Sequence, residues 1–296
     1  MKLLSGYDFG VIIPTLLLLG ISLVVLSSIS ATLFINQLLF TVIGVACFLF
    51  FSSMSIGALK HMKLFFYIIS VFILVLLLFI GVEARGAQRW IEVFSIRMQF
   101  SELLKPFLIV AFAALLTEWG KKLTFLRLAM CIMLFSPIVV LLFRQPDLGN
   151  AIVYAVTFLF MLFSAGVSVW YMLFGFLFFA TSLPLVWRLL AQYQRDRILT
   201  FINPTYDPLG IGYNAIQSAI AVGSGLFFGR GLGRGIQSQL AFLPERHTDF
   251  IFATFSEEFG FLGSVALLVL YFLLLLRILR IAKDCDDVFT SLVAFG

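Results

Sequence analysis

Several polar side chains that could do chemistry stand together directly before a long apolar segment. They lie within Gln237–Phe252, which reads Gln-Ser-Gln-Leu-Ala-Phe-Leu-Pro-Glu-Arg-His-Thr-Asp-Phe-Ile-Phe and contains Glu245, His247 and Asp249. Asp249 stands at the junction between the polar and the apolar part. A carboxylate held half out of water binds a proton more readily and can act as a general base. We therefore predict that Asp249 does the chemistry and that the other segments build a lipid-facing cavity around it; the alternative is a polar cap on a membrane helix.

The apolar segment that follows carries a stripe of small residues at helical spacing. Its members are Ala253, Ser256, Gly260, Gly263 and Ser264. Such a stripe lets another helix pack closely. Because Asp249 precedes Ala253 by about one helical turn, we expect Asp249 to lean toward the packed face and to be buried rather than exposed.

Two other apolar segments also begin with charged residues. Glu102 and Lys105 stand three apart, so they share one face of a helix and can form an ion pair. That pair either orders the helix or supports a site. Asp147 follows Pro146, where it either caps a helix or supplies a second carboxylate that shapes the acidity of the site or binds a cation.

The segment Gly223–Gly235 is dense in glycine and contains Arg230 and Arg234. It lacks the strand-to-helix context of a dinucleotide site and the Lys-Ser/Thr pair of a P-loop. Glycine still lets the backbone approach a phosphate closely, and the two arginines add positive charge. We interpret the segment as a pyrophosphate-binding loop or, alternatively, as a plain flexible loop.

Two further segments supply candidate contacts. Residues 85–99 carry charges of alternating sign and include Arg89 and Trp90. They form either a solvated loop or a cover that touches a headgroup at the mouth of a cavity. Residues 214–222 include Gln217 and predict a short amphipathic helix that lies along the membrane.

Composition places most of the chain in lipid. Of its 296 residues 62% are hydrophobic and 12% are charged, whereas soluble domains are about a quarter charged. The net charge of +5 suits anionic lipid headgroups or a phosphorylated ligand. The basic residues are scattered, which argues against nucleic-acid binding. The cysteines Cys47, Cys131 and Cys285 have unrelated spacings and predict neither a disulfide nor a metal site.

The apolar pattern predicts an all-α polytopic membrane helix bundle with eight full spans. These are Phe9–Ser28, Gln37–Ser53, Leu64–Val82, Leu103–Thr117, Phe125–Phe143, Ala151–Ala165, Val169–Leu190 and Phe250–Leu276. Residues 1–296 are expected to form a single integral membrane domain, in which 191–249 is a large external loop. The excess of Lys and Arg in the short loops on the side of the N-terminus predicts that this side is cytoplasmic. Val288–Gly296 is too short to cross a bilayer, so we expect the sequence to continue.

Taken in order, these motifs resemble the shape, elongation, division and sporulation (SEDS) family, whose members polymerise bacterial peptidoglycan. The resemblance covers essentially the whole chain and is closer to the elongation branch than to the division branch. It rests on Gly86–Ile91, Ser101–Lys105, Gln145–Gly149, Gly229–Gly235 and, above all, Phe242–Phe252.

The resemblance implies ten spans with both termini cytoplasmic, of which eight are visible here. It implies that Asp249 is the essential aspartate of the external loop, that Glu102 and Lys105 are the charged pair of the fourth span, and that Asp147 is a second functional aspartate. It further implies an inverting glycosyltransferase of the bacterial cytoplasmic membrane that uses lipid II. The implied partner is a class B penicillin-binding protein, which cross-links the new strands.

In this hypothesis Asp249 takes a proton from the acceptor sugar hydroxyl. Arginines of the outer loops, or a divalent cation such as Mg²⁺ or Mn²⁺, neutralise the departing pyrophosphate. Supporting contacts are assigned to Gln217, Gln237, Glu245 and His247. One alternative is a lipid II flippase, which needs polar groups along a path to the cytoplasmic side. Another is a non-catalytic scaffold for the penicillin-binding protein, in which Asp249 is dispensable. The polar residues crowd the predicted outer side, which favours surface chemistry.

Overall fold

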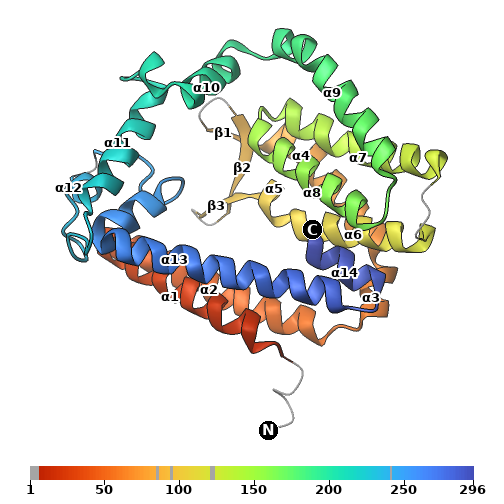
Figure 1. The fold of residues 1–296 in the computed structure, drawn as a ribbon, viewed down its shortest axis with the longest axis horizontal. Coiled ribbons are helices and arrows are strands. Elements are labelled where there is room, and N and C mark those ends of the chain that lie inside the picture. Colours follow the sequence, from red (N-terminus) through yellow and green to blue (C-terminus); the bar gives the residue numbers. More distant parts are fainter. Residues whose placement is uncertain (1–6, 85–86, 94–95, 121–123, 241) are drawn as a thin grey trace. The chain divides into compact units, whose positions relative to one another are not determined.

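The computed structural model describes residues 7–84, 87–93, 96–120, 124–240 and 242–296, without the side chains of residues 82–89, 92–97, 193 and 211. Helices dominate this part of the chain (Figure 1), which confirms the all-α prediction. The helices are α1 (Phe9–Ile29), α2 (Ala31–Ser53), α3 (Ile56–His61), α4 (Lys63–Ile80), α5 (Phe100–Leu103), α6 (Lys105–Trp119), α7 (Phe125–Arg144), α8 (Leu148–Ser164), α9 (Val169–Leu189), α10 (Gln192–Ile202), α11 (Ile211–Ser224), α12 (Ile236–Gln239), α13 (Ile251–Asp284) and α14 (Val288–Phe295), with a 3-10 turn at Pro204–Tyr206.

The predicted membrane spans coincide with helices. Within the described residues, 7 helical segments are long and apolar enough to cross a bilayer, with α5 and α6 counted together as Phe100–Trp119. The remaining predicted span corresponds to α8, an apolar helix of 17 residues. Every residue of α2 and α9 is described and none is buried. Their apolar side chains therefore need lipid rather than water as their surroundings.

The chain forms two compact units. The first comprises Met1–Phe51 and Phe179–Arg277, and the second comprises Ser52–Phe178 and Ile278–Gly296. The expectation of a single membrane domain stays a prediction. The two units are described separately below.

In the first unit, α1 contacts α13 near both of its ends. At the start of α1 the Asp8 carboxylate caps the helix by accepting a bond from Gly10 N, and it pairs with Arg277 at 2.8 Å. At the end of α1, Ser28 Oγ donates to Glu258 Oε1 at 2.7 Å. Because Arg277 and Glu258 lie far apart along α13, these two contacts set the helices side by side and antiparallel, as Figure 1 also shows. The first contact also lowers the pKa of Asp8, chiefly through its hydrogen bond from Arg277.

The second unit has a dense apolar core between α4, α6, α7, α8 and α14. Its centre holds Phe112, Phe135 and Phe158, and the rings of Phe135 and Phe158 stack with centroids 4.1 Å apart. Helix α14 lies beside α6 (Figure 1) and buries Phe289 and Leu292 in this core. The apolar run at residues 288–296 therefore packs as a short helix against the second unit.

The segment 85–99, expected to be an irregular loop, contributes to a three-stranded antiparallel sheet. Its strands are β1 (Val82–Ala84), β2 (Ala87–Val93) and β3 (Ile96–Gln99), in the order β1-β2-β3. In the register of β2 and β3, Trp90 stands opposite Gln99. From the sequence we interpreted this segment as a solvated loop or a cover over a cavity, and the sheet was not predicted.

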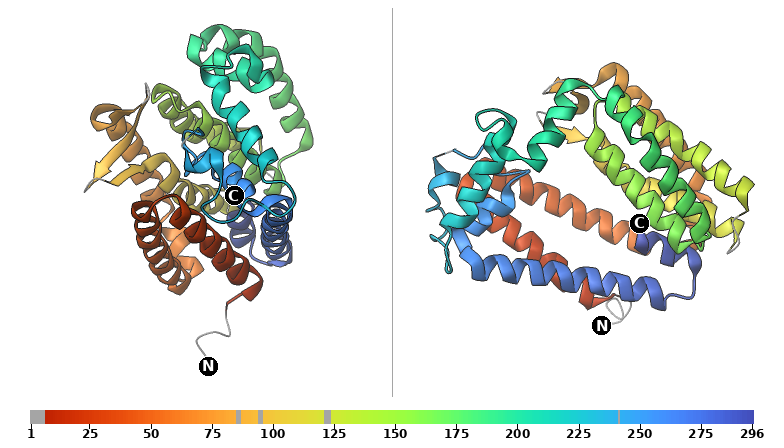
Figure 2. Two further views of the ribbon diagram at one scale, coloured as in Figure 1. Left: turned by 90° about the vertical axis from the view of Figure 1, so that its left-hand side faces the viewer. Right: turned by 45° about the horizontal axis from the view of Figure 1, so that its top comes forward.

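The large segment between α9 and α13 is not a simple loop either. It contains α10, α11 and α12, of which α11 corresponds to the amphipathic helix predicted at residues 214–222. Both views of Figure 2 place α11 and α12 near the Ile251 end of α13, within the first unit.

The pairing of Asp287 with Lys60 predicts a pH dependence of the docking of α14. Asp287 accepts bonds from Lys60 Nζ at 2.8 Å and from Thr290 N at 3.0 Å, and the bond from Lys60 is the main reason that its pKa is lowered. A carboxylate with a lowered folded-state pKa stabilises the docked helix above its ordinary pKa of about 4, and this contribution is lost as the pH falls through the lowered value.

Hydrogen–deuterium exchange in nanodiscs measures this effect. After correction for intrinsic rates, the amides of α14 should exchange faster below about pH 4 than near neutrality, while those of α7 serve as an internal reference. In Asp287→Asn the exchange of α14 should be fast at every pH. Unchanged protection of α14 in that variant would contradict the prediction.

Candidate functional site

The polar motif before α13 forms an ordered turn. Leu243 is buried and packs with Ala221, Ala253 and Phe250, which fixes the turn to the first unit. Within the turn, Glu245 O accepts bonds from Thr248 N at 3.1 Å and from Phe250 N at 3.2 Å. The backbone of the motif is therefore held by its own hydrogen bonds as well as by its apolar anchors.

Asp249 is exposed on this turn, so the prediction that it is buried is wrong. That prediction extended the helical phase of Ala253 back to residue 249. Helix α13 begins only at Ile251, however, and residues 244–250 are turn. The side chain of Asp249 consequently points away from the packed face and is open to an approaching ligand.

The remaining candidate residues of this unit differ in their surroundings. Arg230 and Arg234 are exposed, whereas Gln217, Gln237, Glu245 and His247 are half-buried. Arg230 Nε donates to Ser224 O at 3.0 Å, and Thr248 Oγ1 donates to Glu245 Oε2 at 3.1 Å. Exposed guanidinium groups on a glycine-rich backbone can meet an anion, while Glu245 contributes to the turn that carries Asp249.

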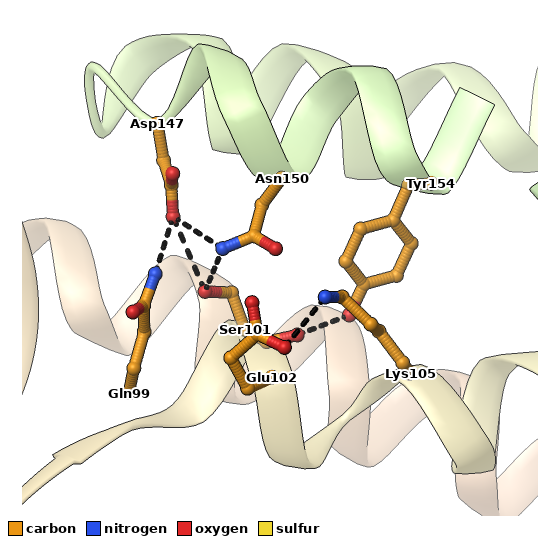
Figure 3. A network of polar contacts seen from close by, with 7 residues as sticks. All are labelled: Gln99, Ser101, Glu102, Lys105, Asp147, Asn150 and Tyr154. Carbon is orange, nitrogen blue, oxygen red and sulfur yellow. Dashed lines mark hydrogen bonds and ion pairs between the residues drawn. The ribbon is translucent and has the colours of Figure 1, made fainter. Parts of the chain in front are cut away.

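Asp147 is the centre of a buried polar network in the second unit (Figure 3). Its Oδ2 atom accepts bonds from Gln99 Nε2 at 2.8 Å, from Ser101 Oγ at 3.3 Å and from Asn150 Nδ2 at 2.9 Å. Tyr154 Oη donates to Ser101 O at 2.7 Å. Asp147 occupies the N-cap position of α8 but makes no capping bond through its side chain. Its carboxylate instead connects β3, α5 and α8.

Glu102 and Lys105 form the predicted ion pair, with Lys105 Nζ 2.6 Å from Glu102 Oε2. The Nζ atom also lies 6.0 Å from the centre of the Tyr154 ring, so the pair borders the Asp147 network (Figure 3). Lys105 and Tyr154 line an apolar cavity of about 170 Å³ between α6, α7 and α8, together with Phe112, Phe135 and Phe158. A cation at the edge of an apolar cavity suits an amphiphile with an anionic headgroup.

The first unit holds a second apolar cavity, of about 400 Å³, between α1 and α2. It is lined by Val11, Ile12, Thr15, Leu16, Leu19, Gln37, Phe40, Thr41, Gly44, Val45 and Phe48. Asp249 lines neither of these two cavities. The predicted lipid-facing cavity around Asp249 therefore stays a prediction, as does the approach of Asp147, Glu102 and Lys105 of the second unit to the same site.

Two candidates lie in the sheet. Trp90 is half-buried and stands opposite Gln99, the residue whose amide contacts Asp147. The side chain of Arg89 lies outside the described part of the structure. The hairpin thus positions Gln99 for the Asp147 network, whereas a contact of Arg89 or Trp90 with a headgroup stays a prediction.

Sequence reasoning missed the residues that contact Asp147 and two buried glutamates of α13. Gln99 and Asn150 could not be assigned to Asp147 from spacing. Glu257 and Glu258 were not singled out as site residues, although both are buried in α13. Two adjacent carboxylates inside an apolar span were the available signal, because ionisable residues in membrane segments are costly and are retained for a function.

The predicted divalent cation finds no assembled ligand set in the described residues. Nowhere in that part of the chain do three or more His, Cys, Asp or Glu side chains gather as they would around a metal ion. We therefore derive no step of the chemistry through a metal.

Comparison with known proteins agrees with the fold. Residues 3–296 match the family described as cell cycle proteins, which includes FtsW, RodA and SpoVE. Peptidoglycan glycosyltransferase MrdB of Escherichia coli (strain K12) is 41% identical over 238 residues, which are 78% of this chain and 63% of that protein. Stage V sporulation protein E of Bacillus subtilis (strain 168) is 37% identical over 98% of this chain and 82% of its own length.

Solved structures are similar over nearly the whole chain. One chain from a study of polymerization and crosslinking by a peptidoglycan synthase complex has a TM-score of 0.82 and 29% identity, covering 99% of this chain and 83% of its own. The rod shape determining protein RodA of Thermus thermophilus has a TM-score of 0.71 and 27% identity, covering 99% and 81%. The sequence spans less than two thirds of the curated relative MrdB, with 63% covered.

The Asp147 network predicts a clear difference between two carboxyl-to-amide substitutions. Asp147→Asn should lower the free energy of unfolding by on the order of 1–3 kcal/mol, because the amide oxygen accepts the three bonds without the charge of the carboxylate, and an N–H donor replaces the second oxygen. Glu102→Gln breaks a pair whose Glu102 side chain is 53% exposed and should change that free energy by less than about 1 kcal/mol. Denaturant titration in detergent micelles measures both; equal effects would contradict the assigned role of Asp147.

Proposed function

Because this chain belongs to the FtsW, RodA and SpoVE family of cell cycle proteins, which it matches over residues 3–296, we propose that it is a peptidoglycan glycosyltransferase of the cytoplasmic membrane. The name of the relative MrdB supports this activity, and the apolar helices support a multi-pass membrane protein. The observation that carries the proposal is the exposed Asp249 carboxylate, held on an ordered turn directly before α13.

The substrate in this proposal is lipid II, a disaccharide-peptide linked to undecaprenyl pyrophosphate. Asp249 accepts the proton of the acceptor sugar hydroxyl while that oxygen forms a bond to the anomeric carbon of the donor chain. The bond from this carbon to the pyrophosphate oxygen breaks, and its electron pair leaves with undecaprenyl pyrophosphate. Attack from the face opposite the leaving group inverts the anomeric centre. The exposure of Asp249 leaves room for a bulky acceptor.

The leaving pyrophosphate needs positive charge, and the first unit offers Arg230 and Arg234 on the glycine-rich segment, both exposed. Guanidinium groups donate two hydrogen bonds to phosphate oxygens at once. The apolar cavities of the two units suit hydrocarbon rather than polar ligands, so the lipid tail can lie among the helices while its headgroup stays at the surface.

A class B penicillin-binding protein is the partner in this proposal. The similar chain from the study of a peptidoglycan synthase complex, in which polymerization and crosslinking are coordinated, supports it. The polymerase would supply uncross-linked strands, and the partner would join them. In the same proposal the active site faces the extracytoplasmic side.

The role of Asp249 as general base is tested by replacing its carboxylate with an amide, which keeps the shape of the side chain and removes the base. Asp249→Asn in the full-length protein, purified with its partner, should polymerise lipid II at least about a hundredfold more slowly, as measured by gel analysis of glycan strands. Its unfolding midpoint should be unchanged because the side chain is exposed.

Asp196→Asn is the matched control. Asp196 lies in the same large segment and accepts a bond from Gln192 Nε2 at 2.9 Å, a bond that an amide oxygen can keep. This variant should polymerise like the unmodified protein. Full polymerisation by Asp249→Asn would overturn the catalytic assignment. Movement of lipid II from one leaflet of a proteoliposome membrane to the other, without polymer formation, would favour the flippase alternative instead.

A further inference from the structure

Helix α13 is interrupted at Gly260, and the glycine-rich segment fills the interruption. Gly260 has φ 69° and ψ −166°, which no helical residue adopts. In an uninterrupted helix Phe261 N would bond to Glu257 O, and Leu262 N to Glu258 O. Here the segment 226–231, which we call the inserted loop, provides partners for all four of these backbone groups.

The exchange of hydrogen bonds is reciprocal. Arg230 N donates to Glu257 O, and Gly231 N donates to Glu258 O, each at 3.0 Å. In the other direction, Phe261 N donates to Leu226 O at 2.9 Å and Leu262 N donates to Phe227 O at 3.1 Å. The inserted loop therefore replaces one turn of the hydrogen-bond ladder of a membrane helix.

Glycine is required where the two backbones meet. A Cβ atom on Gly260 would collide with Gly229 N, and one on Gly229 would collide with Glu258 O. Both glycines also have positive φ, which other residues rarely adopt. Gly225 makes a third close approach, because its Cβ would collide with Ser256 O. The small-residue stripe of α13 thus accommodates a loop at Gly260, where we had expected a helix.

Two buried carboxylates hold the stretch of chain that follows the inserted loop. Glu258 Oε1 accepts a bond from Gly233 N at 2.9 Å and from Ser28 Oγ at 2.7 Å. Glu257 accepts bonds from Gln237 N at 2.9 Å and from Ser238 N at 3.0 Å. Both side chains are almost completely buried, at 0% and 2% exposure. Backbone N–H groups that converge on a buried anion can take the place of the water molecules that would otherwise solvate it.

These carboxylates have no cationic partner among the ion pairs of the described residues. Two acidic groups buried without a countercharge are costly. An amide has a single, uncharged acceptor oxygen, so it would hold these backbone N–H groups less strongly than a carboxylate does. Their retention points to a demand for an exact placement of the backbone from Gly233 to Ser238.

The same stretch of backbone carries the two exposed arginines. Arg230 lies within the inserted loop and Arg234 follows Gly233, the residue held by Glu258. Leu226 and Phe228, 77% and 78% exposed, are apolar side chains of the inserted loop. Arginines beside exposed apolar side chains suit a phosphorylated headgroup that carries a hydrocarbon chain.

We propose that Glu257 and Glu258 are positioning residues, which lock the glycine-rich segment into the interruption of α13 so that Arg230 and Arg234 together bind the diphosphate of a prenyl-linked ligand. The identity of the ligand rests on the proposed function, whereas the locking rests on the contacts alone. Neither carboxylate touches the ligand; each acts on it through the two arginines.

Binding of undecaprenyl diphosphate to the full-length protein in phosphatidylcholine nanodiscs tests the proposal without requiring polymerisation. Glu257→Gln and Glu258→Gln should each weaken binding about tenfold, comparable to the loss of a charge-assisted contact. Arg230→Ala combined with Arg234→Ala should weaken binding at least as much. Inorganic pyrophosphate, which lacks the prenyl chain, should bind more weakly than the lipid but depend on the same arginines.

A thermodynamic cycle separates positioning from general stability. In the background that lacks both arginines, Glu257→Gln should have no further effect on binding, because its role is exerted through them. If Glu257→Gln weakens binding as much in that background as in the unmodified protein, the proposal is overturned. Unchanged binding by both glutamine variants would overturn it as well. If the unmodified protein binds no undecaprenyl diphosphate, the ligand assignment fails. Binding without polymerisation would instead reject the proposed function and leave this inference standing.

Two glycine variants provide a matched pair that does not alter charge. Gly260→Ala should weaken binding because the added methyl group expels the inserted loop. Gly223→Ala should bind normally, since Gly223 lies in α11 and a Cβ there meets no atom within 4 Å. In a background in which Cys47 is replaced by Ser, a cysteine introduced at the buried position of Ser238 should react faster with a polar maleimide in Gly260→Ala than in Gly223→Ala. Equal reactivity and equal binding in the two variants would contradict the locking.

Discussion

A polypeptide in a bilayer must satisfy its own backbone N–H and C=O groups, because hydrocarbon offers no hydrogen-bond partner. Most helices of this protein do so within themselves. Helix α13 does so only with help, since the backbone groups on either side of Gly260 are bonded to residues 226–231. The course of the glycine-rich segment and the presentation of its arginines follow from this requirement. The chain passes from that segment through α12 to the turn that carries Asp249, and the turn leads into α13.

The second unit satisfies buried polar groups with side chains instead of backbone. Asp147 draws together an amide from β3, a hydroxyl from α5 and an amide from α8. Ser101, Asp147 and Asn150 of this network are buried. The adjacent pair of Glu102 and Lys105 is partly open to solvent and is therefore suited to meeting a ligand, whereas Asp147 is suited to maintaining the shape of its surroundings.

Features that depend on local pattern could be predicted from the sequence. The apolar runs located every span, and a spacing of three residues predicted the ion pair of Glu102 and Lys105. The dense polar motif at the edge of an apolar run singled out Asp249 as a candidate, but the turn that carries it was not predicted. The exposure of Asp249 could not be predicted, because it depends on where α13 begins. A small shift in the first residue of a helix changes the direction in which the preceding side chains point.

Contacts between distant residues could not be predicted in the same way. Ser28 and Glu258 are separated by 230 positions, and Gln99 and Asp147 by 48, so no spacing rule connects them. The glycines at 225, 229 and 260 were noticed as permissive residues, but a single sequence does not reveal that they face one another. The short sheet was missed because two of its three strands have only three and four residues, and charges of alternating sign are equally typical of a loop.

The two contacts of α1 with α13 lie on opposite sides of the interruption at Gly260. Asp8 meets Arg277 in the later half of α13, and Ser28 meets Glu258 in the earlier half. Helix α1 consequently bridges two helical pieces that would otherwise be joined by a glycine hinge. Bending at that hinge would have to sacrifice one of the two contacts, so a single uninterrupted neighbour gives a broken helix the rigidity of a continuous one.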